Sequence, residues 1–275
     1  MFLIGQYDSP FVRRVAIAMR LYGIGFEHRP WSTFGDADKI APYNPLRRVP
    51  TLVLDSGEAL IESTAILDYL DETVGPEKAM LPPRGDARRR QLRLCALATG
   101  LGDKAVSLVY ERVLRKEQLK LWVERCEAQI GGVLAVLEQE RAAAKTPYLF
   151  GERIGHAEVA VACVLRFTGE AHAALFSPAR YPALPDVPTF AESGLPGYDV
   201  TSWYGLAMAP DTPRPIVDKL NKAVAEALNR PAIRKQITDI GAQPKTSTPE
   251  ELSQHIAAEV AKWRGVREKA GIPQL

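Results

Sequence analysis

The chain has 275 residues, of which 46% are hydrophobic and 25% are charged, and its formal net charge is +2. This balance excludes the strongly basic surface typical of nucleic-acid-binding proteins and gives no attraction to an anionic membrane. No apolar run reaches the length of a membrane span, and the N-terminus lacks a basic signal region, so we expect a cytoplasmic protein of about two domains. Cys95, Cys126 and Cys163 lie far apart in helical patterns, which predicts reduced core residues and no metal site.

The first quarter of the chain alternates between short apolar runs and helical stripes, in the order β-α-β-α-β-β-α. Apolar runs at residues 2–4, 51–54 and 59–61 predict strands, and the last two flank a turn sequence typical of a hairpin. Ser9 followed by Pro10 is typical of a helix start. We therefore expect an α/β domain over residues 1–78.

Helical spacing dominates residues 86–175. Residues 159–165 are apolar all round, which predicts a buried central helix. Prolines interrupt the pattern at 76–86 and again at 178–188, so we expect an all-helical domain over residues 86–183. A second helix in this domain is predicted by apolar residues that step by three or four: Leu119, Val123, Cys126, Ile130, Val133 and Leu137.

Three motifs within the first 63 residues resemble those of bacterial glutathione S-transferases. They are YDSPFVRRV at residues 7–15, NPLRRVPTL at 44–52 and IES at 61–63. The resemblance covers about residues 1–183. It implies a thioredoxin-like first domain that binds glutathione, a helical domain that supplies the pocket for an electrophile, and a homodimer.

A thiol with an ordinary pKa near 8.5 needs about 2.7 kcal/mol of stabilisation to ionise two pH units lower. One hydrogen bond to a thiolate gives roughly 1.5–3 kcal/mol, and a helix N-terminus adds about 0.3–1 kcal/mol. A hydroxyl in the first helical turn supplies both, so Ser9 is the first candidate for the catalytic residue. Its alternative role is that of an ordinary helix cap. Tyr7 is the rival donor, and its alternative role is that of a wall residue.

The resemblance also implies residues that bind glutathione. Val49-Pro50 matches the family's cis-proline step, where the Val49 backbone pairs with the cysteinyl part of glutathione. Arg48 aligns with the residue that meets the glycyl carboxylate. Glu62 and Ser63 match the residues for the γ-glutamyl ammonium and carboxylate. The alternatives for these residues are a turn proline, a surface charge and a helix cap.

Two positions depart from the family pattern. Arg47 stands where glycine is frequent, which changes the backbone expected for that loop. Gly155 and Glu158 stand where a buried capping box has Ser or Thr and Asp, so the reciprocal side-chain bond of that box is lost.

From residue 184 the sequence resembles a different family. The segments LPDVPTFAESGLPGY at 184–198, WYGL at 203–206, APDTP at 209–213 and KAGI at 269–272 resemble the closing third of Bug/TctC-type substrate-binding proteins. These are periplasmic carboxylate binders of tripartite tricarboxylate transport. The chain therefore resembles a fusion of two truncated genes, joined near Ala183-Leu184.

The tail, residues 184–275, is predicted to be mainly helical. Residues 200–208 favour a strand, stripes at 217–228 and 233–240 favour two helices, and Thr248-Pro249-Glu250-Glu251 is a capping box that opens a third. Most of the two-domain fold of the substrate-binding proteins is missing. We assign no ligand-binding residues to this part.

The main hypothesis is a glutathione transferase that joins the glutathione thiolate to small hydrophobic electrophiles. A glutathione-dependent isomerase or reductase is the second hypothesis, distinguished by whether glutathione is consumed. A non-catalytic, transferase-like binding protein is the third, distinguished by insensitivity to Ser9→Ala. A carboxylate-binding tail is the fourth, distinguished by stabilisation of the tail by citrate.

Overall fold

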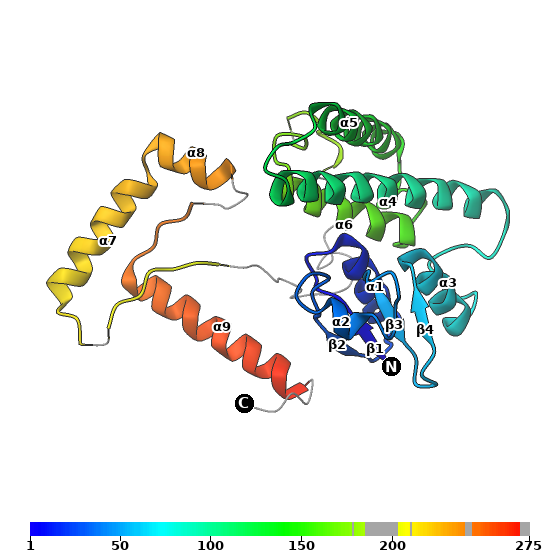
Figure 1. Cartoon of the computed structure of the whole chain (residues 1–275), viewed down its shortest axis with the longest axis horizontal. Helices are drawn as coiled ribbons and strands as arrows, with labels where there is room; N and C mark the ends of the chain where they lie inside the picture. The colour runs from blue at the N-terminus through cyan, green and yellow to red at the C-terminus, as the bar shows by residue number, and fades with distance from the viewer. Residues whose placement is uncertain (178, 185–202, 210, 240–243, 270–275) are drawn as a thin grey trace. The chain divides into compact units, whose positions relative to one another are not determined.

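The computed structural model describes residues 1–177, 179–184, 203–209, 211–239 and 244–269. The chain divides into two compact units, Met1–Asp199 and Val200–Leu275. Figure 1 colours the elements from blue at the N-terminus to red at the C-terminus. No helix in the described ranges is long and apolar enough to cross a membrane.

The first 74 residues have the predicted β-α-β-α-β-β-α order. The sheet order is β2-β1-β3-β4, in which β1 is parallel to β2 and antiparallel to β3, and β4 is antiparallel to β3. The elements are β1 (Phe2–Ile4), α1 (Pro10–Leu21), β2 (Glu27–Arg29), α2 (Ala37–Ile40), β3 (Thr51–Val53), β4 (Ala59–Ile61) and α3 (Ser63–Val74). This confirms the thioredoxin-like α/β class.

Alternation along the short strands decides which helices cover each face of the sheet. Leu3 and Leu52 are fully buried in a cluster with apolar residues of α1 and α3. Ile4 points to the opposite face and is buried with Ile40 of α2 and with Val53. Both faces of the sheet are therefore covered by helices. Candidate functional groups are thus expected at the ends of the strands.

The second half of this unit is helical, as predicted. It consists of α4 (Gly85–Leu114), α5 (Lys120–Ala143) and α6 (His156–Ala171). Helix α6 packs against α4 on one side and against α1 on the other, which agrees with its apolar surroundings (Figure 1). Glu158 keeps one half of the capping box, because its Oε2 accepts a bond of 2.9 Å from the Gly155 N–H.

All three cysteines are buried and free, as expected of core residues. Burial raises the pKa of Cys95 to about 11 and that of Cys163 to about 12. Thiols with such values are protonated at neutral pH and are poor nucleophiles.

The chain remains anchored to the helical half up to residue 184. Tyr181 and Leu184 are buried in the core of α4, α5 and α6. The Glu138 carboxylate of α5 accepts bonds from the backbone N–H groups of Ala183, at 2.8 Å, and Leu184, at 3.1 Å. The position of the predicted join is therefore part of the first unit's core.

The second unit contains α7 (Arg214–Leu228), α8 (Pro231–Asp239) and α9 (Pro249–Lys269). The capping box is confirmed, since Thr248 and Glu251 exchange backbone-to-side-chain bonds of 2.8 and 3.1 Å. No residue of α7 is buried. Helix α7 therefore gains little from the hydrophobic effect.

The strand predicted at 200–208 is wrong where it can be assessed. Residues 203–208 have no strand pairing, because a strand needs a hydrogen-bonded neighbour and the described part of this unit offers none. The predicted segments at 185–198, 200–202, 240 and 270–272 lie outside the described residues.

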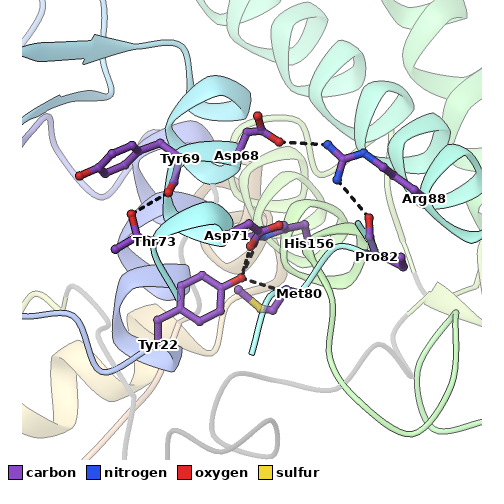
Figure 2. Close-up of polar contacts among 9 residues, drawn as sticks. All are labelled: Tyr22, Asp68, Tyr69, Asp71, Thr73, Met80, Pro82, Arg88 and His156. Carbon is purple, nitrogen blue, oxygen red and sulfur yellow. Dashed lines mark hydrogen bonds and ion pairs between the residues drawn. The ribbon is translucent and has the colours of Figure 1, made fainter. Parts of the chain in front are cut away.

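A buried polar cluster joins the two halves of the first unit (Figure 2). Asp71 Oδ1 on α3 accepts a bond from the Tyr22 hydroxyl and lies 2.8 Å from Nε2 of His156 on α6. The Tyr22 oxygen accepts a bond of 2.8 Å from the Met80 N–H in the connection to α4. Asp71 and His156 are 7% and 3% exposed, so the cluster is shielded from water.

Candidate functional site

The register of the sheet places the three motif segments at the same end of its strands. Ile4, at the end of β1, pairs with Thr51, at the start of β3, and Thr51 pairs with Ile61, at the end of β4. The loops that follow β1 and β4 and the loop that precedes β3 therefore leave the sheet at the same end. The candidate residues lie within these loops, or at the helix starts that follow them.

Ser9 is the N-cap of α1. Its Oγ accepts a bond of 3.3 Å from the Val12 N–H, and its own N–H donates to Asp8 Oδ1 at 2.8 Å. Accepting this bond uses an oxygen lone pair and leaves the hydroxyl proton available as a donor. Ser9 thus fits both of its predicted roles, because capping α1 does not prevent it from donating a bond to an anion.

Tyr7 packs against β2 of the sheet. Its ring stacks on the His28 ring with centroids 4.0 Å apart and planes 6° apart. His28 Nε2 lies 2.7 Å from the Gly5 carbonyl, which can only accept, so this nitrogen carries the proton. Burial lowers the pKa of His28, which keeps the ring neutral at pH 7.

The Val49-Pro50 peptide bond is cis, as expected. Val49 is half-buried and lies two residues before Thr51, the first residue of β3 that pairs with β1. Its backbone therefore extends β3 beyond the hydrogen-bonded part of the sheet. Arg48 is exposed, and its Nη2 lies 4.0 Å from Glu62 Oε1 and 3.9 Å from Asp103 Oδ1 of α4.

Arg47 has a φ of +50°, so this arginine adopts the left-handed backbone that glycine adopts more easily. The backbone change expected from the arginine at this position is therefore not seen, because Arg47 keeps a conformation that glycine also adopts. Its guanidinium lies 3.4 Å from exposed Asp38.

Glu62 and Ser63 form the junction between β4 and α3. Glu62 precedes the helix with a φ of +69°, which is rare for a residue other than glycine and is typical of functional sites. Ser63 is the first residue of α3 and is only 3% exposed. The unpaired N–H groups of this first turn make a site suited to a carboxylate.

Two residues that sequence reasoning did not select shape the loop before β3. Buried Asn44 donates from Nδ2 to the Arg48 carbonyl at 2.9 Å and to Thr51 Oγ1 at 3.1 Å, and its Oδ1 accepts from Leu46 N–H at 3.0 Å. Gly5 has a φ of +128°. A Cβ there would lie 2.7 Å from Val49 Cβ, so only glycine lets this loop approach β1.

Replacing Asn44 with alanine is expected to reduce the free energy of unfolding by about 1–3 kcal/mol, because buried backbone groups of the loop lose their partner. Urea denaturation measures this loss. Asn221→Ala, which removes one side-chain bond to the Ser247 carbonyl in the second unit, is the control and should cost less than about 1 kcal/mol. Equal stability of Asn44→Ala and wild type would contradict the role of Asn44 in this loop.

No group of three potential metal ligands is present in the described part of the chain. The candidate residues offer hydroxyl, backbone and charged groups. These groups lie at the start of α1, along the backbone at Val49 and at the start of α3.

Family models match three parts of the chain. The glutathione S-transferase N-terminal domain matches residues 3–78, and the corresponding C-terminal domain matches residues 121–184. The tripartite tricarboxylate transporter family receptor matches residues 160–272. Because the last two matches overlap, the predicted join near Leu184 and the predicted domain limits stay predictions.

Individual proteins match both parts. A maleylacetoacetate isomerase from Pseudomonas aeruginosa is 31% identical over 167 residues, which are 57% of this chain and 76% of that protein. A UPF0065 protein from Agrobacterium vitis is 38% identical over 106 residues, which are 37% of this chain and 31% of that protein. The chain spans only 26%, 31% and 54% of the length of three curated relatives that it matches.

A solved structure of a glutathione transferase family member from Pseudomonas fluorescens Pf-5, with bound glutathione, is 31% identical to this chain. The match has a TM-score of 0.57 and covers 67% of this chain and 90% of the other. The similarity therefore extends over nearly all of that protein.

Proposed function

The chain belongs to the glutathione S-transferase family, whose models match residues 3–78 and 121–184, and from this premise we propose that it joins the thiol of glutathione to small hydrophobic electrophiles. One observation carries the proposal: Ser9, Val49 and Ser63 lie in segments that flank the same end of the sheet's strands. Each segment offers a different kind of contact to a different part of a γ-glutamyl peptide.

The chemistry requires a thiolate, and we assign its stabilisation to Ser9. The hydroxyl donates a hydrogen bond to sulfur and keeps its own proton, while the start of α1 adds favourable potential. The thiolate then attacks the electrophilic carbon, a carbon–sulfur bond forms, and the displaced electron pair leaves with a leaving group or is protonated by water. Tyr7, stacked on His28, is assigned to the wall of this site.

The remaining candidate residues bind the rest of glutathione. Ser63 and the N–H groups of the first turn of α3 take the γ-glutamyl carboxylate, and Glu62 takes the ammonium. The Val49 backbone pairs with the cysteinyl unit as an added strand, next to cis Pro50. Arg48, exposed beside Glu62, takes the glycyl carboxylate.

A second candidate function is glutathione-dependent isomerisation, favoured by the similarity to a maleylacetoacetate isomerase. The two reactions share the thiolate and differ in its fate. Conjugation consumes one glutathione for each electrophile, whereas isomerisation returns it, so thiol titration during turnover separates them.

We also propose a homodimer, as the family resemblance implies, and a cytoplasmic location, in keeping with three buried cysteines that form no disulfide. For the tail we propose no ligand-binding function. The match to the UPF0065 protein from Agrobacterium vitis covers 31% of that protein, and no residue of helix α7 is buried.

Calorimetric titration of the full chain with glutathione tests the proposed binding. We expect binding in the micromolar-to-millimolar range, and Ser63→Ala is expected to weaken it about tenfold or more through loss of a hydrogen bond to a carboxylate. Ser253→Ala, in α9, is the control and should leave the affinity unchanged. Absence of binding by folded wild type, or equal binding by Ser63→Ala, would contradict the proposed site.

A further inference from the structure

A buried arginine lies behind the Ser9 turn. Arg13 follows Ser9 by four residues on α1, so both lie on the same face of the helix. Helical side chains lean toward the N-terminus, and the Arg13 Nε accordingly donates a bond of 2.9 Å to the Tyr7 carbonyl. The Arg13 side chain is only 6% exposed. Its positive charge is thus fixed beside the loop that carries Ser9.

This charge has little compensation among the described residues. Arg13 Nη1 is buried and has no hydrogen-bond partner there. The nearest carboxylate belongs to Glu170 of α6, whose Oε2 lies 4.0 Å from Arg13 Nη2, beyond hydrogen-bonding distance. Glu170 is half-exposed, and its other oxygen accepts a bond of 2.8 Å from Arg166.

A second buried arginine lies on the same helix, and the carboxylate that acts on it is that of Glu62. Arg14 on the same helix is 2% exposed, and its Nε and Nη1 also lack partners within the described residues. On α6, Cys163 is protonated because burial raises its pKa, although Arg13, Arg14 and Arg166 each act to lower it. On the loop, Asp8 carries a negative charge, but its side chain is exposed and screened by water.

We propose that Arg13 is a positioning residue that holds the Tyr7–Ser9 turn and stabilises the bound thiolate through its charge, and that Glu170 of the helical half attenuates this effect. The inference rests on the proposed function. It makes opposite predictions for the two residues: loss of the Arg13 charge disfavours the thiolate, and loss of the Glu170 charge favours it.

The test is the ultraviolet absorbance of the thiolate in the glutathione complex, recorded against pH, with calorimetric affinity as a second readout. In Arg13→Gln the pKa of the bound thiol is expected to rise by about one unit, as for loss of a nearby opposite charge. Arg13→Lys, which keeps the charge, should recover part of the shift. In Glu170→Gln the pKa of the thiol is expected to fall by about half a unit, less than for a buried partner because Glu170 is half-exposed.

Glu124→Gln is the matched control. It removes the carboxylate from a similar pair four residues apart on α5, Lys120–Glu124, and should shift nothing. If Arg13→Gln does not fold, Glu170→Gln still tests the proposal, because Glu170 is exposed. Its substitution is expected to lower the pKa of the bound thiol, and loss of structure would not lower that pKa. An unchanged or raised pKa of the thiol in Glu170→Gln overturns the proposal. Absence of a thiolate signal in folded wild type overturns the proposed function itself, together with this inference.

Discussion

Replacing Ser9 with alanine is expected to raise the pKa of the bound glutathione thiol by about one to two units, because one hydrogen bond to the thiolate, worth roughly 1.5–3 kcal/mol, is lost. Turnover at neutral pH should fall about tenfold to a hundredfold. The affinity for glutathione should change little, since Ser63, Val49 and Arg48 are assigned to the other parts of the peptide. Conjugation rates measured between pH 6 and 9 give both quantities.

Ser9 also caps α1, so a variant must separate capping from chemistry. Glycine is nearly as good a cap as serine, whereas alanine costs about 1 kcal/mol. Ser9→Gly should therefore keep stability and lose turnover, and Ser9→Thr should keep both. If Ser9→Ala and Ser9→Gly stay fully active while Tyr7→Phe does not, the donor is Tyr7, and the hypothesis for Ser9 is wrong.

Replacing Asp71 with alanine is expected to reduce the free energy of unfolding by about 3–5 kcal/mol, the usual cost of breaking a buried charge-assisted pair. The His156 ring and the Tyr22 hydroxyl would both lose the acceptor that they share (Figure 2). Asp68→Ala on the same helix removes the exposed pair with Arg88, at 3.0 Å, and should cost less than about 1 kcal/mol. Urea denaturation compares the two variants.

This prediction has a pH dependence with a definite sign. Burial acts to raise the pKa of the Asp71 carboxyl, but the bonds from His156 and Tyr22 outweigh it and lower that pKa below its ordinary value. Such a carboxyl contributes stability above its unfolded pKa, about 3.9, and loses that contribution as pH falls through the folded pKa. Wild type and Asp71→Ala differ in unfolding free energy by the contribution of this carboxyl. This gap should therefore narrow below pH about 4. A gap that widens there would contradict the assignment.

Local patterns were sufficient to predict much of the first unit. The Ser9-Pro10 start of α1, the three apolar strand segments and the stripes of α5 and α6 each depend on a few neighbouring residues. The motif resemblance then supplied the cis bond at Pro50, which spacing alone does not specify. The positions of the candidate residues could be predicted because they sit at strand ends and helix starts, and such ends have local signals.

Contacts between distant residues could not be predicted in this way. His156 bonds to Asp71 across 85 positions, and no local pattern links a histidine at a helix start to an acid in the last turn of another helix. Asn44 and Gly5 act on a loop whose shape emerges only when β3 pairs with β1. The strand expected from residue 200 failed for a related reason, since an apolar run becomes a strand only beside a partner.

The most direct test of the account is a crystal structure of the full chain with glutathione. We expect the sulfur within hydrogen-bonding distance of Ser9 Oγ, the cysteinyl backbone paired with Val49, and the γ-glutamyl carboxylate at Ser63 and the first turn of α3. Glutathione bound elsewhere on the chain would contradict the assignment of this end of the sheet as the binding site. A sulfur directed to Tyr7 Oη and away from Ser9 would contradict the assignment of Ser9 as the residue that activates the thiol.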